Sequence, residues 1–307
     1  MDIFLQQIVN GLVQGSIYAL VALGYTMVYG IMGLINFAHG EVVMIGTLVT
    51  ITVAGSLIKA GMPLALAGLA GLSASVLVCM ALGWGLERIA YRPLRNAPRL
   101  TPLITAIGMS IVLQNLAMMI WGRNYLTFPA LLPKINFEVA GAHFTFIQVV
   151  IVLVSAVTMG GLLALIYRTK LGMAMRATAQ NPAVASLMGV NINRVIAAAF
   201  VIGSALGALA GVMVGTYYEI AHYQMGFMLG LKAFTAAVLG GIGNLAGAML
   251  GGVLLGLIEA LGAGYIGDLT GGFLGSHYQD IFAFIVLIVV LMFKPSGLFG
   301  EKTGDRA

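Results

Sequence analysis

Charged residues are scarce in this sequence of 307 residues. Asp, Glu, Lys and Arg together make up 8% of it, whereas about a quarter is usual for a soluble globular domain. Hydrophobic residues make up 60%, and the mean hydropathy is +1.03. So few charges exclude a soluble protein, because its surface would expose large apolar patches to water. We therefore expect residues 1–307 to form a single integral-membrane domain.

Signatures of catalytic and metal chemistry are also missing. The one cysteine, Cys79, cannot form an internal disulfide and lies in an apolar run, where a small buried hydrophobe is expected. No G-x-x-x-x-G-K-[ST] sequence occurs, so the chain has no Walker A loop for ATP. The histidines lie far apart, without the spacing of metal ligands: His39, His143, His222 and His277. We expect no catalytic residue, no metal site and no cofactor in this chain, and hence no enzyme.

Long apolar runs recur along the chain at the length of a membrane span. A hydrocarbon core about 30 Å thick takes roughly 20 helical residues, and a helix satisfies its own backbone hydrogen bonds in lipid. The runs are 8–30, 42–57, 64–86, 103–121, 146–167, 195–217, 227–241, 245–266 and 281–293. They predict an all-α, polytopic membrane helix bundle of about eight to nine transmembrane segments, in which 227–241 is short or re-entrant.

The Lys and Arg residues are distributed unevenly between the two sets of loops. Eleven lie on one side: Arg88, Arg92, Arg95, Arg99, Arg168, Lys170, Arg176, Arg194, Lys294, Lys302 and Arg306. Three lie on the other side: Lys59, Arg123 and Lys134. Because Lys and Arg in short loops resist translocation, the richer side is expected in the cytoplasm, with the N-terminus outside and the C-terminus inside. This distribution explains the net charge of +5 without a nucleic-acid partner.

Three ionisable residues fall within or beside the predicted spans: Glu41, Lys232 and Glu259. Placing a charged side chain at the centre of a membrane helix costs about 2.5 to 3.5 kcal/mol, so each of these residues needs a structural or functional explanation. Glu41 starts the second helix, where it either complements the helix dipole or lies beside a pathway through the bundle. Lys232 either extends toward the outer face or pairs with Glu259 inside the bundle. Glu259 lies near mid-span, where a partner or a water-lined location is expected.

The second basic loop contains the signals of a short helix. Asn181 supplies an N-cap, Pro182 a first helical residue and Gly189 a stop, which predicts a helix over 182–188. Its apolar face comprises Val184, Leu187 and Met188, and it is flanked by Arg176 and Arg194. Such a helix either lies on the membrane surface or docks into a groove of a cytoplasmic partner, and the defined cap and stop favour docking.

Glycines form two stripes at four-residue intervals. The first comprises Gly203, Gly207, Gly211 and Gly215, and the second comprises Gly243, Gly247 and Gly251. Glycine on one helix face lets another backbone approach closely. We expect both stripes to serve helix packing.

Four stretches carry a resemblance to a known family, and the loop 172–194 adds to it. They are 25–46 (YTMVYGIMGLINFAHGEVVMIG), 87–95 (ERIAYRPLR), 106–115 (AIGMSIVLQN) and 230–243 (GLKAFTAAVLGGIG). With them the sequence resembles the LivH-type permease subunits of bacterial high-affinity branched-chain amino acid ABC transporters. The resemblance runs from near the N-terminus to Pro295-Ser296-Gly297, whereas 122–145 and the tail after Gly300 match nothing specific.

The resemblance implies a multi-pass inner-membrane subunit that moves leucine, isoleucine and valine. It implies a second homologous permease, two cytoplasmic ATP-binding subunits that bind ATP and Mg²⁺, and a periplasmic amino-acid-binding protein as partners. The segment with Asn36, His39 and Glu41, and the short segment with Lys232, then lie beside the translocation path. The loop 172–194 then transmits the movement of the ATP-binding subunits.

Other functions remain open at this point. An ion-coupled secondary transporter would carry several acidic residues in its spans, whereas only Glu259 lies clearly mid-span. A passive channel would need no partner, and a membrane enzyme would need a nucleophile and base that are not visible. Within the family, another small solute such as urea or a different amino acid is also compatible with the sequence.

Overall fold

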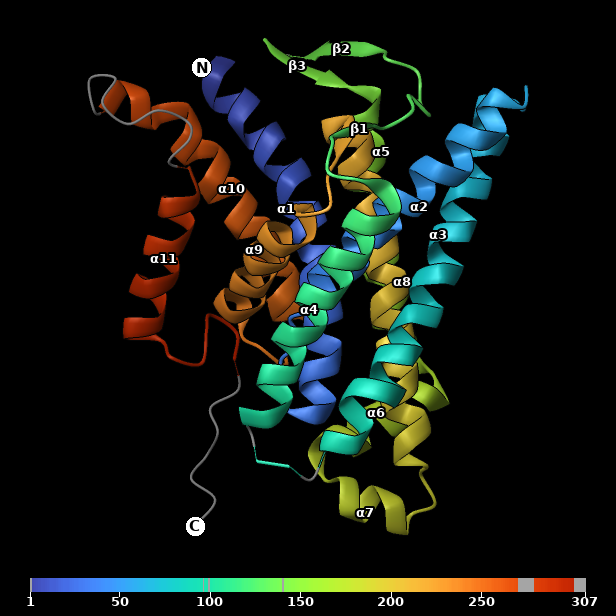
Figure 1. Ribbon diagram of the computed structural model, residues 1–307. Coiled ribbons are helices and arrows are strands. Elements are labelled where there is room, and N and C mark those ends of the chain that lie inside the picture. Colours follow the sequence, from blue (N-terminus) through green and yellow to red (C-terminus); the bar gives the residue numbers. More distant parts are fainter. Residues whose placement is uncertain (1, 96, 99, 140, 270–278, 301–307) are drawn as a thin grey trace.

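A computed structural model of the chain describes residues 2–95, 97–98, 100–139, 141–269 and 279–300 (Figure 1). Its bundle is built from α1 (Asp2–Met32), α2 (His39–Lys59), α3 (Leu64–Leu86), α4 (Leu100–Trp121), α5 (Phe146–Arg168), α8 (Ile192–Tyr218), α9 (Met225–Gly240), α10 (Leu245–Leu269) and α11 (Gln279–Phe293). Seven of the described helices are long and apolar enough to cross a membrane, and α9 and α11 are shorter. The predicted all-α polytopic bundle is confirmed, because every predicted span coincides with one of these helices to within six residues at either end.

Two further helices and four short strands lie at the ends of the bundle. The helices are α6 (Lys170–Gln180) and α7 (Pro182–Leu187), and the strands are β1 (Leu126–Thr127), β2 (Asn136–Val139), β3 (Ala142–Thr145) and β4 (Ile220–Ala221). Strands β2 and β3 form an antiparallel hairpin, and β1 pairs antiparallel with β4. The hairpin and α7 lie at opposite ends, which we call the hairpin end and the α7 end (Figure 1).

The helices alternate in direction between these two ends. Helix α1 starts at the hairpin end, and α8 and α10 both run from the α7 end toward the hairpin end (Figure 1). Helix α3 continues through a π-helical turn (Glu87–Tyr91) and a 3₁₀ turn (Arg92–Leu94) at the α7 end. The described cations of both basic loops therefore share the α7 end, as the charge count predicts. Arg99, Lys302 and Arg306 lie outside the described residues.

Helix α9 is the short segment that the sequence predicts. Its 16 residues extend about 24 Å at 1.5 Å per residue, less than a hydrocarbon core of about 30 Å. It packs against α1, α2 and α10 in the middle of the bundle (Figure 1). It carries the chain from β4 at the end of α8 back to the start of α10.

The glycine stripe on α8 lies where helix backbones meet. A Cβ on Gly203 would contact the backbone of Gly24 in α1, and a Cβ on Gly211 would lie 2.3 Å from the carbonyl oxygen of Val43 in α2. The expected packing role is confirmed for these positions. In the second stripe, Gly251 packs against α9, but Gly243 lies in the turn before α10 with a φ of 97°, and a Cβ there would meet no other atom within 4 Å.

Candidate functional site

Three helices bring together a buried group of polar side chains, which we call the ion-pair cluster: Tyr18 of α1, Lys232 of α9 and Glu259 of α10. The Lys232 Nζ lies 3.2 Å from Glu259 Oε2, and the Tyr18 hydroxyl donates to the same oxygen at 2.8 Å. Lys232 also donates to the Tyr18 oxygen at 3.3 Å. The Lys232 side chain is 14% exposed and that of Glu259 is 0% exposed. The prediction of pairing inside the bundle is confirmed, and the alternative of extension toward the outer face is wrong.

Close backbone packing explains why the Glu259 carboxylate is so deeply buried. Helices α1 and α10 run antiparallel with small residues between them, so that a Cβ on Gly15 would lie 2.7 Å from the Val253 Cα. On the other side, a Cβ on Gly251 of α10 would lie 2.2 Å from the Ala236 carbonyl oxygen of α9. With both neighbours this near, water has little access to the carboxylate. A carboxylate in such surroundings needs the Lys232 ammonium as a partner.

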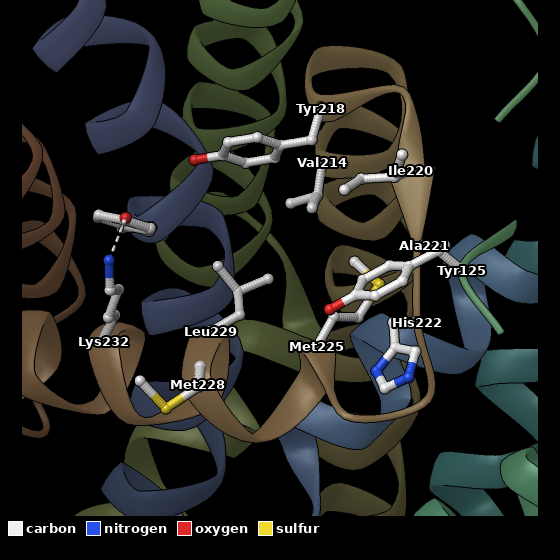
Figure 2. A pocket seen from close by; sticks show the side chains of 11 residues that line it. Tyr125, Val214, Tyr218, Ile220, Ala221, His222, Met225, Met228, Leu229 and Lys232 are labelled. Atoms are coloured by element: carbon white, nitrogen blue, oxygen red, sulfur yellow. Dashed lines mark hydrogen bonds between the residues drawn. The ribbon is translucent and has the colours of Figure 1, made fainter. Parts of the chain in front are cut away.

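A pocket of about 250 Å³ adjoins the ion-pair cluster, between α1, α8 and α9. Its lining residues are Tyr18, Tyr125, Val214, Tyr218, Ile220, Ala221, His222, Met225, Met228, Leu229 and Lys232. Figure 2 shows Lys232 at one end and Tyr125 with His222 at the other, with Leu229 between them. The pocket thus combines an apolar wall with one charged end, as binding sites for small molecules commonly do.

The loop after α4 closes over the connection between α8 and α9. Residue Glu219 ends α8 in the left-handed conformation with a φ of 58° and forms an ion pair with Lys134. Its carbonyl oxygen accepts from the Phe128 amide at 2.9 Å, beside the pairing of β1 with β4. The His222 Nε2 lies 3.0 Å from the Arg123 carbonyl oxygen. These contacts fix the aromatic rim of the pocket at the hairpin end.

A second buried carboxylate, that of Glu41, connects α2 with α4. Its Oε1 accepts from the Ser110 hydroxyl at 2.9 Å and from the Gln114 amide at 2.7 Å. The carboxylate is fully buried, and its hydrogen bonds go to α4 rather than to the first turn of α2. We call Glu41, Ser110 and Gln114 the Glu41 cluster. Glu41 lies in the first turn of α2, as the helix-dipole alternative predicts, and its carboxylate also joins α2 to α4.

Asn36 and His39 lie in helix contacts near the start of α2. The Asn36 Oδ1 accepts from the Tyr91 hydroxyl at 2.8 Å and from the Ala38 amide at 3.1 Å. The buried His39 ring lies edge-on to Tyr25, with centroids 5.0 Å apart. These two side chains stabilise the turn between α1 and α2.

The sequence-predicted path residues therefore fall into separate groups. Lys232 and Glu259 are brought together beside the pocket, whereas Asn36, His39 and Glu41 are outside its lining. The sequence did not single out Tyr18 of the ion-pair cluster, or Ser110 and Gln114 of the Glu41 cluster. All three are polar side chains inside long apolar runs, which is the signal that would have found them.

The short helix of the second basic loop forms as predicted, as α7. Asn181 caps it by accepting from the Val184 amide at 3.1 Å, Pro182 is its first residue, and Gly189 follows with a φ of 85°. It ends at Leu187, one residue before the predicted end at Met188, which is its C-cap. The side chains of Val184, Leu187 and Met188 are exposed, the last two to 86% and 81%.

Helix α6, which the sequence analysis did not predict, joins α7 to the bundle. The Arg176 guanidinium donates to the Ile166 carbonyl oxygen and lies 5.2 Å from the centre of the Tyr167 ring. A cavity of about 90 Å³ lies between α6 and the helices α1, α5 and α10, with Met27 and Met175 among its lining residues. Helix α6 thus contacts α1, which also carries Tyr18 of the ion-pair cluster.

These features define a multi-pass membrane protein with a charged, partly apolar pocket inside its bundle, which is typical of solute transport. The chain belongs to the family described as the branched-chain amino acid transport system permease component, which matches residues 7–291. The resemblance noted from the sequence stretches is thereby confirmed. The chain is a transport component and not an enzyme.

Three relatives illustrate the range of this similarity. The chain is 48% identical to the high-affinity branched-chain amino acid transport system permease protein BraD of Pseudomonas aeruginosa, over 99% of this chain and 98% of the relative. It is 46% identical to the LivH permease protein of Salmonella typhimurium, over 99% and 97%. It is 28% identical to a probable LivH permease protein of Methanocaldococcus jannaschii, over 95% and 91%.

Proposed function

We propose that this chain is the permease subunit of a bacterial ABC importer that moves leucine, isoleucine and valine across the inner membrane. The family match over residues 7–291 supports it, as do relatives whose names give them as high-affinity branched-chain amino acid permeases. The observation that carries the proposal within the molecule is the pocket beside the ion-pair cluster, in a bundle whose other buried surface is mostly apolar. Residues 1–307 act as one permease domain. The family match favours this function over an ion-coupled secondary transporter or a urea permease.

The complete importer contains further subunits. We infer a second homologous permease, two cytoplasmic subunits that bind ATP and Mg²⁺, and a periplasmic amino-acid-binding protein, all surrounded by membrane lipid. No cofactor belongs to this chain. The cation-rich α7 end faces the cytoplasm with the C-terminus, and the hairpin end faces the periplasm with the N-terminus.

Helix α7 is the contact for an ATP-binding subunit in this proposal. Its exposed Leu187 and Met188 form an apolar tip that a groove on a partner covers. Movement of α7 passes to α6 and then to α1 and α10, which line the 90 Å³ cavity with α6. The same two helices carry Tyr18 and Glu259. ATP binding and hydrolysis on the partners thereby change which side of the bundle is open.

The test is Leu187→Asp in the complete importer reconstituted in vesicles. A carboxylate at the apolar tip disrupts docking, so we expect leucine uptake to fall about tenfold or more, as for loss of an interface hot spot, while the permease stays inserted. ATP hydrolysis, measured in parallel, then no longer responds to the loaded binding protein. The matched control is Ile135→Asp, another exposed apolar residue, next to the hairpin at the opposite end. Unchanged transport in Leu187→Asp would contradict the docking role.

The class of transporter is tested by what purifies with the tagged chain in mild detergent. Two ATP-binding subunits and a second permease are expected. A homodimer alone, together with leucine uptake that continues without ATP and stops when the ion gradient is removed, would overturn the proposal in favour of a secondary transporter.

A further inference from the structure

The pocket beside Lys232 has a polarity that matches one kind of solute. We propose that it is a station on the translocation path for a zwitterionic amino acid with an apolar side chain. The carboxylate of the solute lies at Lys232, and its side chain lies against Leu229, Met225 and Val214. This inference rests on the proposed function, since it names which residues of the permease hold the transported solute.

The charged end of the pocket favours a solute without net charge. Lys232 lines the pocket, while its partner Glu259 lies behind it and is fully buried. The pair is neutral as a whole, so a zwitterion enters without leaving an unbalanced charge in an apolar site. An amino acid with an acidic or basic side chain would add such a charge. The Lys232 ammonium has three donors, and a carboxylate is the group it binds best.

The hydroxyl groups at the same end extend this polar surface. The Tyr218 hydroxyl points from α8 toward the side of Lys232 (Figure 2), and the Gln14 amide lies 3.5 Å from it. The Tyr18 hydroxyl accepts a hydrogen bond from Lys232 and donates one to Glu259. The face of Tyr218 is a suitable neighbour for the ammonium group of the solute, because aromatic rings attract cations.

The wall of the pocket away from Lys232 is apolar and adaptable. Val214 and Leu229 provide branched aliphatic surface, and Met225 and Met228 provide unbranched thioether chains (Figure 2). Methionine adapts its shape to different neighbours, which suits a wall that accepts leucine, isoleucine and valine in turn. The volume of about 250 Å³ lies below the range of about 300–1,000 Å³ that is usual for drug-sized ligands. It therefore suits a small solute.

The rim places the entrance of this station at the hairpin end. The rings of Tyr125 and His222 stack with centroids 4.5 Å apart, and the Tyr125 side chain is largely exposed. Both residues belong to segments joined by the pairing of β1 with β4. A solute released at that end meets the aromatic rim first, then the apolar wall and Lys232.

Filling the pocket tests this inference. In the complete importer, Leu229→Trp places an indole in the pocket, and we expect leucine uptake to fall about tenfold or more while the loaded binding protein still stimulates ATP hydrolysis. The matched control is Leu77→Trp, because Leu77 is an exposed leucine of α3 outside the pocket lining. If the Leu229→Trp importer transports leucine at the unsubstituted rate, the proposed station is wrong. If the unsubstituted importer does not transport leucine, the proposed function itself fails.

Cysteine protection provides a second measurement that does not depend on the tryptophan variant folding. The native Cys79 is fully buried, so Met225→Cys adds a thiol that a small reagent distinguishes from it. The measurement uses the complete importer held in its ATP-bound state. We expect millimolar leucine to slow modification of the thiol at position 225 at least about twofold, whereas glutamate and lysine should leave the rate unchanged. Ile135→Cys, at an exposed position next to the hairpin, is the control, and its modification should be unaffected by leucine. Equal effects of leucine, glutamate and lysine at position 225 would overturn the station.

Discussion

Glu41 and Glu259 are both fully buried in the bundle, yet their surroundings differ in chemistry. Glu259 has a cationic partner in Lys232 and a hydroxyl donor in Tyr18. Glu41 accepts from two neutral donors, Ser110 and Gln114. Within the residues that the structure describes, neither Lys nor Arg forms an ion pair with Glu41.

The two carboxylates also differ in position: the ion-pair cluster borders a pocket, whereas the Glu41 cluster connects two helices. The ion-pair cluster joins α1, α9 and α10, and its Lys232 lines a pocket, where we propose that the solute binds. The Glu41 cluster lies between α2 and α4, and Glu41 is outside the pocket lining. Two carboxylates with equal burial are therefore expected to respond differently to the same substitution.

The largest effect is expected for Glu259→Gln. This change removes the negative charge from the buried pair with Lys232, and breaking a buried ion pair costs about 3–5 kcal/mol. We expect the unfolding midpoint of the purified subunit in detergent to fall, and leucine uptake to fall further than membrane abundance does. Adding Lys232→Met to this variant removes the second charge and should restore the midpoint but not uptake. Equal losses of uptake and abundance in Glu259→Gln would assign the residue to packing alone.

An intermediate effect is expected for Tyr18→Phe, which removes the hydroxyl that donates to Glu259. A hydrogen bond to a charged group contributes about 1.5–3 kcal/mol, so the unfolding free energy in detergent should decrease by this amount. Ser110→Ala is the matched change in the Glu41 cluster, and we expect it to cost less. A larger loss in Ser110→Ala would reverse the ranking of the two clusters.

The smallest effect is expected for Glu41→Gln. The amide oxygen of glutamine still accepts from Ser110 and Gln114, and no paired cation is left behind among the described neighbours. We expect a change of about 1 kcal/mol or less in unfolding free energy, close to that of a single neutral hydrogen bond, and uptake within a few-fold of the unsubstituted importer. Loss of transport at normal abundance would instead place Glu41 on the path.

Local sequence signals predicted the parts of the fold that depend on nearby residues. The span 64–86 coincides with α3 because a long apolar run in lipid has no stable alternative to a helix. The α7 helix was predicted because Asn181, Pro182 and Gly189 act within a few residues of one another. Pairing of Lys232 with Glu259 was one of two alternatives, since no local signal chose between them.

Other parts escaped prediction because they depend on contacts between distant residues. Helix α6 has mixed polarity, and it is held by Arg176 on the Ile166 carbonyl and by its packing against α1. The pairing of β1 with β4 joins Leu126 to Ala221 across almost a hundred residues of chain. Neither strand contains a periodic pattern or a capping residue that would predict its partner.

The sequence by itself determined that this protein is a multi-pass helical bundle with a cation-rich end and a capped loop helix, and it carried the family resemblance. These properties follow from composition and short-range pattern. Only the tertiary structure decided that Tyr18, Lys232 and Glu259 meet beside a pocket, whereas Glu41 of α2 accepts hydrogen bonds from α4. The reason is that glycine contacts set how closely α1, α9 and α10 approach, and this distance decides which polar side chains reach one another.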